Sequence, residues 1–348
     1  MHGSTAKQAK LPLYAPTCLS ASGIFMPYIH GNEAKLITMP CTTNSINTVD
    51  CRHGGINKFI DDVGGLGFDG IALKNTLQNP LPPFVPVIPK AFFDISPEII
   101  PYGIIGITLK DVFNNPPQKR AGRLCAPKEL TIDENIFSKR LLKEKHVLLF
   151  SSGKDSLIEL LWPQCDAINF FGKMGSLINT ATGFDFSLFC GECPVGHALN
   201  LKKSLVTIAD YEQYGIKSIP HIYWANEYHL QRWATFLNNN QDVKTVATNC
   251  QCYKTQDHDM VCGGIQWLLA HCKRLHFLLE GPSKKLLRKL ESIPETAGHI
   301  SIAVSYPACL ARNHQTLNRE KSQLEIHQLL TNNFHAYESL LVKTLAKM

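Results

Sequence analysis

The sequence predicts an α/β fold, namely a TIM-barrel-like array of parallel β/α units that follows an irregular N-terminal portion. Two observations support this prediction. From about residue 143 onward, short apolar runs alternate with segments of helical periodicity, which is typical of parallel strands joined by crossover helices. In addition, no glycine-rich dinucleotide fingerprint follows any of these runs, which disfavours a dinucleotide-binding sheet. About eight such units close a barrel, whereas fewer form an open doubly wound sheet.

The composition is that of a folded globular protein. Of the 348 residues, 44% are hydrophobic and 18% are charged, whereas disordered chains contain fewer apolar residues and more charge. The net charge of +6 permits a phosphate or nucleic-acid partner without requiring one. No apolar run is long enough for a secretory signal or a membrane span. We therefore expect a cytoplasmic protein without a membrane partner, in which cysteines are reduced.

Three regions are expected along the chain. Residues 1–140 form an irregular N-terminal portion that contributes early β/α units, residues 141–318 form the regular β/α domain, and residues 319–348 form a C-terminal helical segment. The five prolines between Asn79 and Pro89 exclude a helix or a central strand. They predict an extended connection or an edge strand.

The expected strands and helices follow from apolar periodicity. The predicted strands lie at residues 67–75, 102–113, 146–150, 166–171, 183–189, 216–224, 244–251, 276–281 and 300–307. The predicted helices lie at residues 156–162, 200–215, 226–240, 263–275, 283–293 and 319–347. Gly215 is the expected stop of the helix that precedes it.

A short polar loop directly follows the apolar run HVLLF. It consists of Ser151, Ser152, Gly153, Lys154, Asp155 and Ser156. The loop resembles that of the PP-loop ATP pyrophosphatases, whose usual form is S-G-G-x-D-S. That resemblance implies phosphate binding by the loop and an ATP-dependent nucleotidyl-activating enzyme that uses ATP with Mg²⁺. Ser152 stands where the superfamily usually has a glycine, and the alternative is a plain turn in which Asp155 or Ser156 caps the next helix.

A second set of short motifs spans roughly residues 143–305. It comprises Gly183-Phe184-Asp185-Phe186-Ser187-Leu188-Phe189, Pro194, Asn200, Tyr214-Gly215-Ile216, Ile219-Pro220-His221, Thr248-Asn249-Cys250 and Leu279-Glu280-Gly281. Together these motifs resemble an uncharacterised protein family of bacterial phages, plasmids and integrative elements. The resemblance implies a barrel-like α/β domain and a mobile-element origin, and it implies no established reaction.

Polar residues at the ends of the apolar strands form the candidate catalytic site, because chemistry in α/β folds lies at the carboxyl ends of the strands. The candidates are Asp185, His221, Glu227, Asn249 and Glu280. An Asp within an apolar strand costs free energy unless it is paired, so Asp185 is either functional or tied to backbone amides. We expect Asp185 and Glu227 to act as acid and base, His221 as a proton shuttle and Asn249 as a hydrogen-bond donor to substrate.

Two close cysteine pairs provide a competing metal hypothesis. Cys190 and Cys193 form a C-x-x-C motif, and Cys250 and Cys252 form a C-x-C motif. If the fold brings the pairs together, four thiolates can hold zinc or an iron–sulfur cluster. The alternative is that they are small buried hydrophobic residues.

Basic residues are clustered on one predicted helix, at Lys284, Lys285, Arg288 and Lys289. They form either a solvated face or a contact for a phosphate-bearing partner. The primary interpretation is a mobile-element protein that binds or acts on a phosphate-containing small molecule or a nucleic acid at the strand-end site. The alternatives are the ATP-dependent enzyme and a non-enzymatic DNA-binding replication or maintenance factor. Whether the protein is an enzyme, and whether it uses zinc or ATP with Mg²⁺, stays open at this point.

Overall fold

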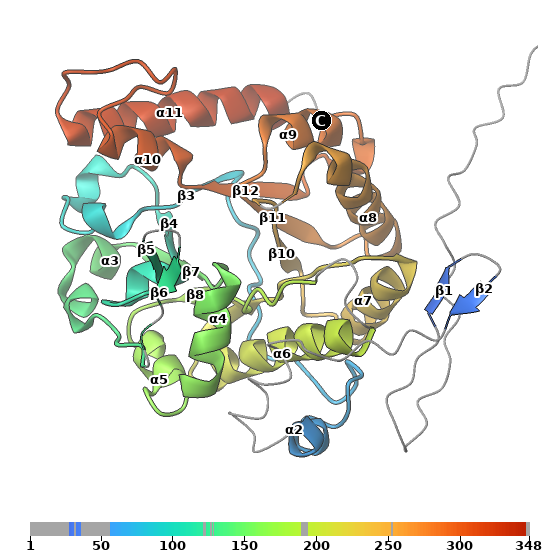
Figure 1. Cartoon of the computed structure of the whole chain (residues 1–348). Coiled ribbons are helices and arrows are strands. Elements are labelled where there is room, and N and C mark those ends of the chain that lie inside the picture. The colour runs from blue at the N-terminus through green and yellow to red at the C-terminus, as the bar shows by residue number, and fades with distance from the viewer. Residues whose placement is uncertain are drawn as a thin grey trace, which may run out of the picture.

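Two four-stranded sheets, each entirely parallel, lie at the centre of the molecule, and helices surround them (Figure 1). The computed structural model describes residues 28–30, 33–35, 56–120, 123–125, 127, 129–188, 194–251 and 253–345. The α/β class predicted from the alternation of apolar runs is therefore confirmed.

The strand order of the first sheet is β4-β7-β8-β9, and that of the second is β10-β11-β12-β3. The strands of the first sheet are β4 (Ile104–Thr108), β7 (His146–Phe150), β8 (Thr180–Thr182) and β9 (Lys217–Ile219). Those of the second are β3 (Phe84–Pro86), β10 (Thr245–Asn249), β11 (His276–Glu280) and β12 (Ile300–Val304). The proline-rich segment thus supplies an edge strand of the second sheet, as predicted.

Isolated parallel bridges connect the two sheets at both of their edges. Val87, the residue after β3, pairs with Gly106 in β4, and the Ile88 N–H donates to the Gly106 carbonyl at 2.8 Å. At the other edge, His221 pairs with Ala247 in β10. Strands β3 and β4, which belong to the predicted N-terminal portion, therefore pair with strands of the predicted regular domain.

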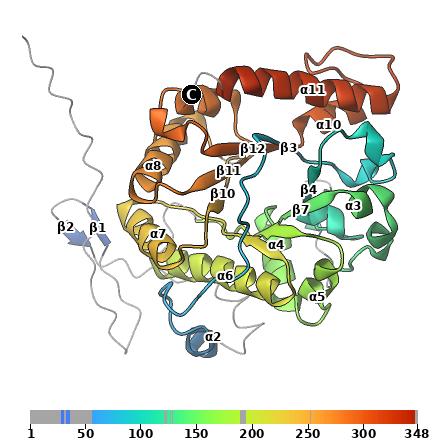
Figure 2. The same cartoon turned by 180° about the vertical axis from the view of Figure 1, so that it is seen from behind.

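The helices cover the outer faces of the sheets, which both views show (Figures 1 and 2). They are α2 (Ile56–Asp62), α3 (Arg140–Glu144), α4 (Asp155–Leu161), α5 (Phe170–Gly175), α6 (Pro194–Gln213), α7 (Glu227–Asn239), α8 (His258–His271), α9 (Lys284–Leu290), α10 (Tyr306–Arg312) and α11 (Ile326–Leu345). Two antiparallel pairs, β1 (Tyr28–His30) with β2 (Glu33–Lys35) and β5 (Gln118–Arg120) with β6 (Arg123–Cys125), lie outside the parallel sheets. None of the described helices is long and apolar enough to cross a bilayer.

The strands are apolar on both faces, as parallel strands covered on both sides must be. Along β7, Val147 and Leu149 belong to the large core beneath the helices, whereas Leu148 and Phe150 belong to a second, smaller core. This alternation follows from the two-residue period of a strand. The smaller core collects side chains from both sheets: Val85, Leu148, Phe150, Ile219, Ala247, Leu278 and Ala303.

The prediction of a strand over residues 166–171 is wrong, because helix α5 begins at Phe170. Asn169 adopts a left-handed conformation with φ of 49°, which turns the chain into the helix. Phe170 and Phe171 then pack against Tyr211 of α6, with ring centroids 6.3 Å and 5.0 Å apart. The apolar run thus marks helix packing, and strand β8 lies further along the chain.

Other predicted boundaries also shift. The chain leaves the sheet after Thr182, so residues 183–188 are an extended connection rather than a strand. Residues 67–75 form no strand, and residues 319–325 precede the C-terminal helix instead of belonging to it. The helix stop at Gly215 is confirmed by its φ of 76°. Neither Asp155 nor Ser156 caps α4, because its N-cap residue is Lys154 and makes no capping bond.

Candidate functional site

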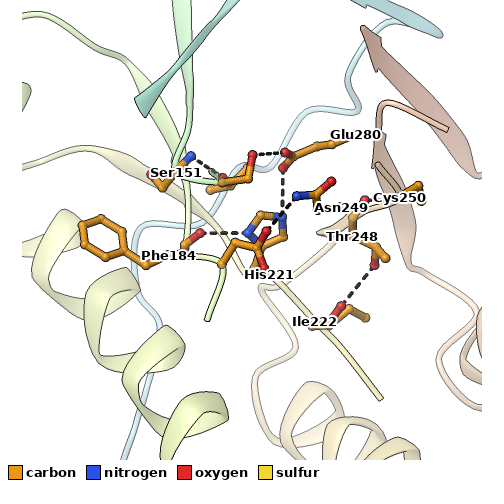
Figure 3. A network of polar contacts seen from close by, with 12 residues as sticks. Ser151, Phe184, His221, Ile222, Thr248, Asn249, Cys250 and Glu280 are labelled. Atoms are coloured by element: carbon orange, nitrogen blue, oxygen red, sulfur yellow. Dashed lines mark hydrogen bonds and ion pairs between the residues drawn. The ribbon is translucent and has the colours of Figure 1, made fainter. Parts of the chain in front are cut away.

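A buried network of polar side chains lies where the strands end (Figure 3). Its centre is Glu280, the last residue of β11. One carboxylate oxygen, Oε1, is 2.9 Å from Nε2 of His221, and the other accepts a hydrogen bond from the Ser152 hydroxyl. His221 follows β9 and Ser152 follows β7. Although β7, β9 and β11 are not adjacent in the strand order, the residues that end these strands come together on the carboxyl-end side of the sheets.

Both ring nitrogens of His221 have partners. Nδ1 lies 2.9 Å from the carbonyl oxygen of Gly183, so this nitrogen carries a proton. Burial lowers the pKa of His221, but the Glu280 carboxylate, Asp185 and the Gly183 carbonyl together outweigh burial and raise the pKa to about 8. At neutral pH the ring is an imidazolium that donates from Nδ1 to the Gly183 carbonyl and forms an ion pair with Glu280 through Nε2.

Asp185 is held beside this pair by Asn249, the last residue of β10. The Asn249 side-chain amide donates to Oδ2 of Asp185 at 2.7 Å, and its oxygen accepts the Gln251 N–H at 3.0 Å. Burial raises the pKa of Asp185, while nearby His221 and hydrogen bonds from Tyr223 and Asn249 oppose that rise. Because both polar groups of Asn249 are engaged within the protein, this residue orients Asp185.

The loop after β7 uses its hydroxyl groups inside the protein. The Ser151 hydroxyl lies 2.8 Å from the Tyr211 hydroxyl, and the Ser151 N–H donates to Oγ1 of Thr182 at 2.9 Å. Ser152 holds Glu280 as described above. Further along, Asp155 accepts a hydrogen bond from Ser187 at 2.7 Å. The loop thus connects β7 to the network, and its role as a nucleotide-binding loop stays a prediction.

A cavity of about 770 Å³ opens above this network at the carboxyl ends of the strands. Glu280 and Ser152 line it, whereas His221 and Asp185 are not among its lining residues. The remaining polar lining comes from Thr108, Gln251, Ser283, Lys284, Ser305, Tyr306, Cys309, Asn318, Arg319 and Tyr337. Glu280 is therefore the acidic group of the network that a ligand in the cavity meets.

Of the other predicted site residues, Glu227 lies apart from the network, whereas Cys250 borders it through a 2.8 Å hydrogen bond from its backbone N–H to the Glu280 carbonyl. Glu227 is exposed at the start of α7 and accepts a hydrogen bond from Gln231 at 3.3 Å. Cys250 is buried, which raises the pKa of its thiol, and its sulfur contacts the Thr248 carbonyl at 3.6 Å. Cys190, Cys193 and Cys252 lie outside the described residues. Within the described part of the chain, no group of three or more His, Cys, Asp or Glu residues is arranged to hold a metal ion.

The four basic residues of the predicted helix have different surroundings. Lys284 lines the cavity, Lys289 contacts Asp259, and Lys285 and Arg288 are exposed. They do not form one uniform basic face.

Sequence reasoning missed three features of the cavity: the bond between Ser152 and Glu280, and the positions of Tyr306 and Arg319. A signal existed for Tyr306, which follows the end of β12 as directly as the predicted residues follow their strands. Arg319 had no local signal, because it lies in a connection whose position depends on the packing of α10 and α11.

No known family model matches the chain, and no curated protein sequence matches it either. The resemblances to the mobile-element family and to the PP-loop enzymes, with the origin and the activity that they imply, therefore stay predictions.

Proposed function

We propose that the protein is an enzyme that performs acid–base chemistry on a phosphate-containing small molecule, with Glu280 as the catalytic residue. One observation carries this proposal: the Glu280 carboxylate lines the cavity, where one of its oxygens is held by Ser152, which lines the same cavity, and the other by the buried His221 ring. A carboxylate fixed in this way is preorganised, which general acid–base catalysis requires.

We further propose that the two sheets close into one TIM-barrel-like array. The bridges at Val87 and at His221 support closure at both edges of the sheets. The smaller apolar core, which draws side chains from both sheets, fits the interior of such a barrel. In that architecture the active site lies at the carboxyl ends of the strands, where the cavity lies.

Each residue of the network then has a distinct role. Glu280 takes a proton from a hydroxyl or an acidic C–H group of the substrate and returns it at a later step. The His221 ring and the Ser152 hydroxyl hold the carboxylate in one orientation. Asp185 offsets the charge of His221, so His221 and Asp185 are positioning residues that act through Glu280.

The position of the cavity supports a phosphate-bearing ligand. Its lining residues 281–284 follow β11, and residues 305–309 follow β12. In the proposed barrel these are the last two strands in chain order, whose following loops frequently bind phosphate in TIM barrels. The volume of about 770 Å³ is within the range of pockets for small ligands.

The proposal is tested with a panel of phosphorylated hydroxy and keto compounds in deuterated water. Product formation and deuterium incorporation are followed by proton and phosphorus NMR. We expect the wild type to turn over at least one compound and Glu280→Gln to lose about 10²-fold or more of that rate. The exposed Glu227→Gln is the matched control and should keep the wild-type rate. Equal turnover by Glu280→Gln, with its fold verified by circular dichroism, would overturn the assignment.

A further inference from the structure

A short hairpin between α10 and α11 places an arginine at the edge of the cavity. We call residues 314–322 the strap. Gln315 and Lys321 form an antiparallel bridge, and the Arg319 N–H closes the turn by donating to the Thr316 carbonyl at 2.8 Å. The buried Asn333 of α11 anchors the strap through a 2.9 Å bond to the Gln315 carbonyl. The tip residues 317–319 therefore line the cavity from a fixed base.

The backbone of Arg319 is held in an unfavourable conformation. Its φ of 66° lies in the left-handed region that only glycine adopts without cost. His314, at the start of the strap, also has a positive φ of 52°. Strained residues of this kind cluster at ligand sites, where the position of the side chain outweighs the loss of stability.

Tyr306 orients the side chain of Arg319. Its Nε donates to the Tyr306 hydroxyl at 3.0 Å, and its guanidinium carbon lies 5.9 Å from the centre of the Tyr306 ring. Tyr306 also lines the cavity. Since none of the described residues accepts a hydrogen bond from the two terminal nitrogens of the guanidinium group, both are available for a bidentate anion contact.

The charges that line the cavity are unbalanced. They are Glu280, Lys284 and Arg319. Glu280 is already paired with His221, whereas neither Lys284 nor Arg319 forms an ion pair with any carboxylate of the described residues. Two cations from different connections, one after β11 and one in the strap, thus face a shared space in which no described carboxylate forms an ion pair with them.

We propose that Arg319 and Lys284 bind the phosphate group of a phosphate monoester, and that the strap is the specificity determinant that orients this ligand toward Glu280. Two positive charges match the dianionic monoester, and the forked guanidinium group can donate to two of its terminal oxygens at once. The inference that phosphate binds here is drawn from the strap and the cavity alone. The inference that the reacting group of the ligand points toward Glu280 rests on the proposed function.

Binding is measured on the full chain by calorimetry with inorganic phosphate and with glycerol phosphate as probes. We expect Arg319→Gln and Lys284→Gln each to weaken both probes by about tenfold or more, which corresponds to the loss of one charge-assisted contact. The matched controls are the exposed Lys285→Gln, next to Lys284, and the exposed Arg312→Gln, close to the strap. Neither control residue lines the cavity, so both variants should bind within about twofold of the wild type.

A pair of glycine variants separates the phosphate site from a merely structural strap. Arg319→Gly and His314→Gly both relieve a positive φ, so both should raise the melting temperature. Only Arg319→Gly should lose phosphate binding. If Arg319→Gly binds phosphate like the wild type, or if both variants lose binding equally, Arg319 is not the phosphate ligand.

Two further measurements distinguish a failure of the catalytic assignment from a failure of the phosphate site. Glu280→Gln should bind inorganic phosphate at least as tightly as the wild type, because it removes a negative charge from the same cavity. If Glu280→Gln stays active while Arg319→Gln loses phosphate, the catalytic assignment fails and the phosphate site stands. A 5′-phosphorylated oligonucleotide that competes as well as glycerol phosphate would assign the site to nucleic-acid ends, and failure of every phosphate probe to bind the wild type would overturn the site.

Discussion

The imidazole of His221 and the carboxylate of Glu280 meet at 2.9 Å between Nε2 and Oε1, with both side chains almost completely buried. This contact links the connection after β9 to the end of β11, which are not adjacent in the strand order. A buried charged pair of this kind is costly to break, because removal of one partner leaves the other charge uncompensated. The pair therefore couples the stability of the strand ends to protonation.

Stability should fall as the pH rises above neutrality. The pKa of His221 is about 8 in the folded protein and 6.5 in the unfolded reference, so the folded state binds more protons in this range. The stabilisation is complete below pH 6.5 and is lost as the pH rises through 8, which amounts to roughly 2 kcal/mol. Urea denaturation at pH 6 to 9 measures this slope. The titratable neighbours of the ring are Glu280, Asp185 and Tyr223.

His221→Gln keeps a donor toward Glu280 but does not titrate. The free energy of unfolding of this variant should not fall between pH 6.5 and 8. The exposed His327→Gln should keep the pH dependence of the wild type. A slope that persists in His221→Gln would show that another group causes it.

His229 should produce the opposite slope on the acidic side. Burial lowers its pKa to about 4, and His197 and Arg232 act in the same direction. Nδ1 of this ring accepts the Ala225 N–H at 3.2 Å, which requires that this nitrogen carry no proton. The unfolded state binds more protons between pH 4 and 6.5, so stability should rise with pH across this window by roughly 3 kcal/mol. In His229→Asn, which retains an acceptor oxygen, denaturation curves at pH 4.5 and 6.5 should differ less than in the wild type.

Asn249→Asp should place two carboxylates in contact. The amide that now donates to Asp185 at 2.7 Å becomes a second acceptor, and like charges at that distance cannot both stay ionised without cost. We expect a loss of roughly 3 kcal/mol at pH 7.5 that shrinks toward pH 5, where one carboxyl group takes up a proton.

Asn249→Ala is the comparison for that variant. It removes the hydrogen bond that opposes the rise of the Asp185 pKa but adds no charge, so its loss of about 1–3 kcal/mol should depend less steeply on pH than that of Asn249→Asp. Equal pH dependence in both variants would mean that charge repulsion at Asp185 is not the cause. The measurement is the free energy of unfolding from urea titrations at the two pH values.

Much of the candidate site was predictable from one rule, that polar residues ending parallel strands gather at one edge. The rule correctly brings together Asp185, His221, Asn249 and Glu280. Glu227 separates from them because it begins a helix, and the first side chain of α7 points to solvent.

The cavity wall was not predictable in the same way. Arg319 reaches the cavity only because the strap folds back over α10 and is fixed by Asn333. That arrangement depends on contacts between residues that share no local pattern. Likewise, the run at residues 166–171 is apolar enough for a strand, but packing of Phe170 and Phe171 on α6 makes it helical. Periodicity identifies burial, and tertiary packing then selects between helix and strand.

The adjacent glycines of α8 should respond in opposite directions to substitution by alanine. A Cβ atom on Gly264 would collide with the Trp224 indole, which is buried and donates from Nε1 to the Met260 carbonyl at 3.2 Å. The rigid ring cannot move aside without breaking that bond, so Gly264→Ala should lose roughly 1–3 kcal/mol of unfolding free energy. A Cβ on Gly263 meets no atom within 4 Å, and alanine in a helix interior is favoured over glycine by about 0.5–1 kcal/mol. Thermal denaturation should therefore give a lower melting temperature for Gly264→Ala and a higher one for Gly263→Ala. A shift of the same sign in both variants would contradict the close approach of α8 to Trp224.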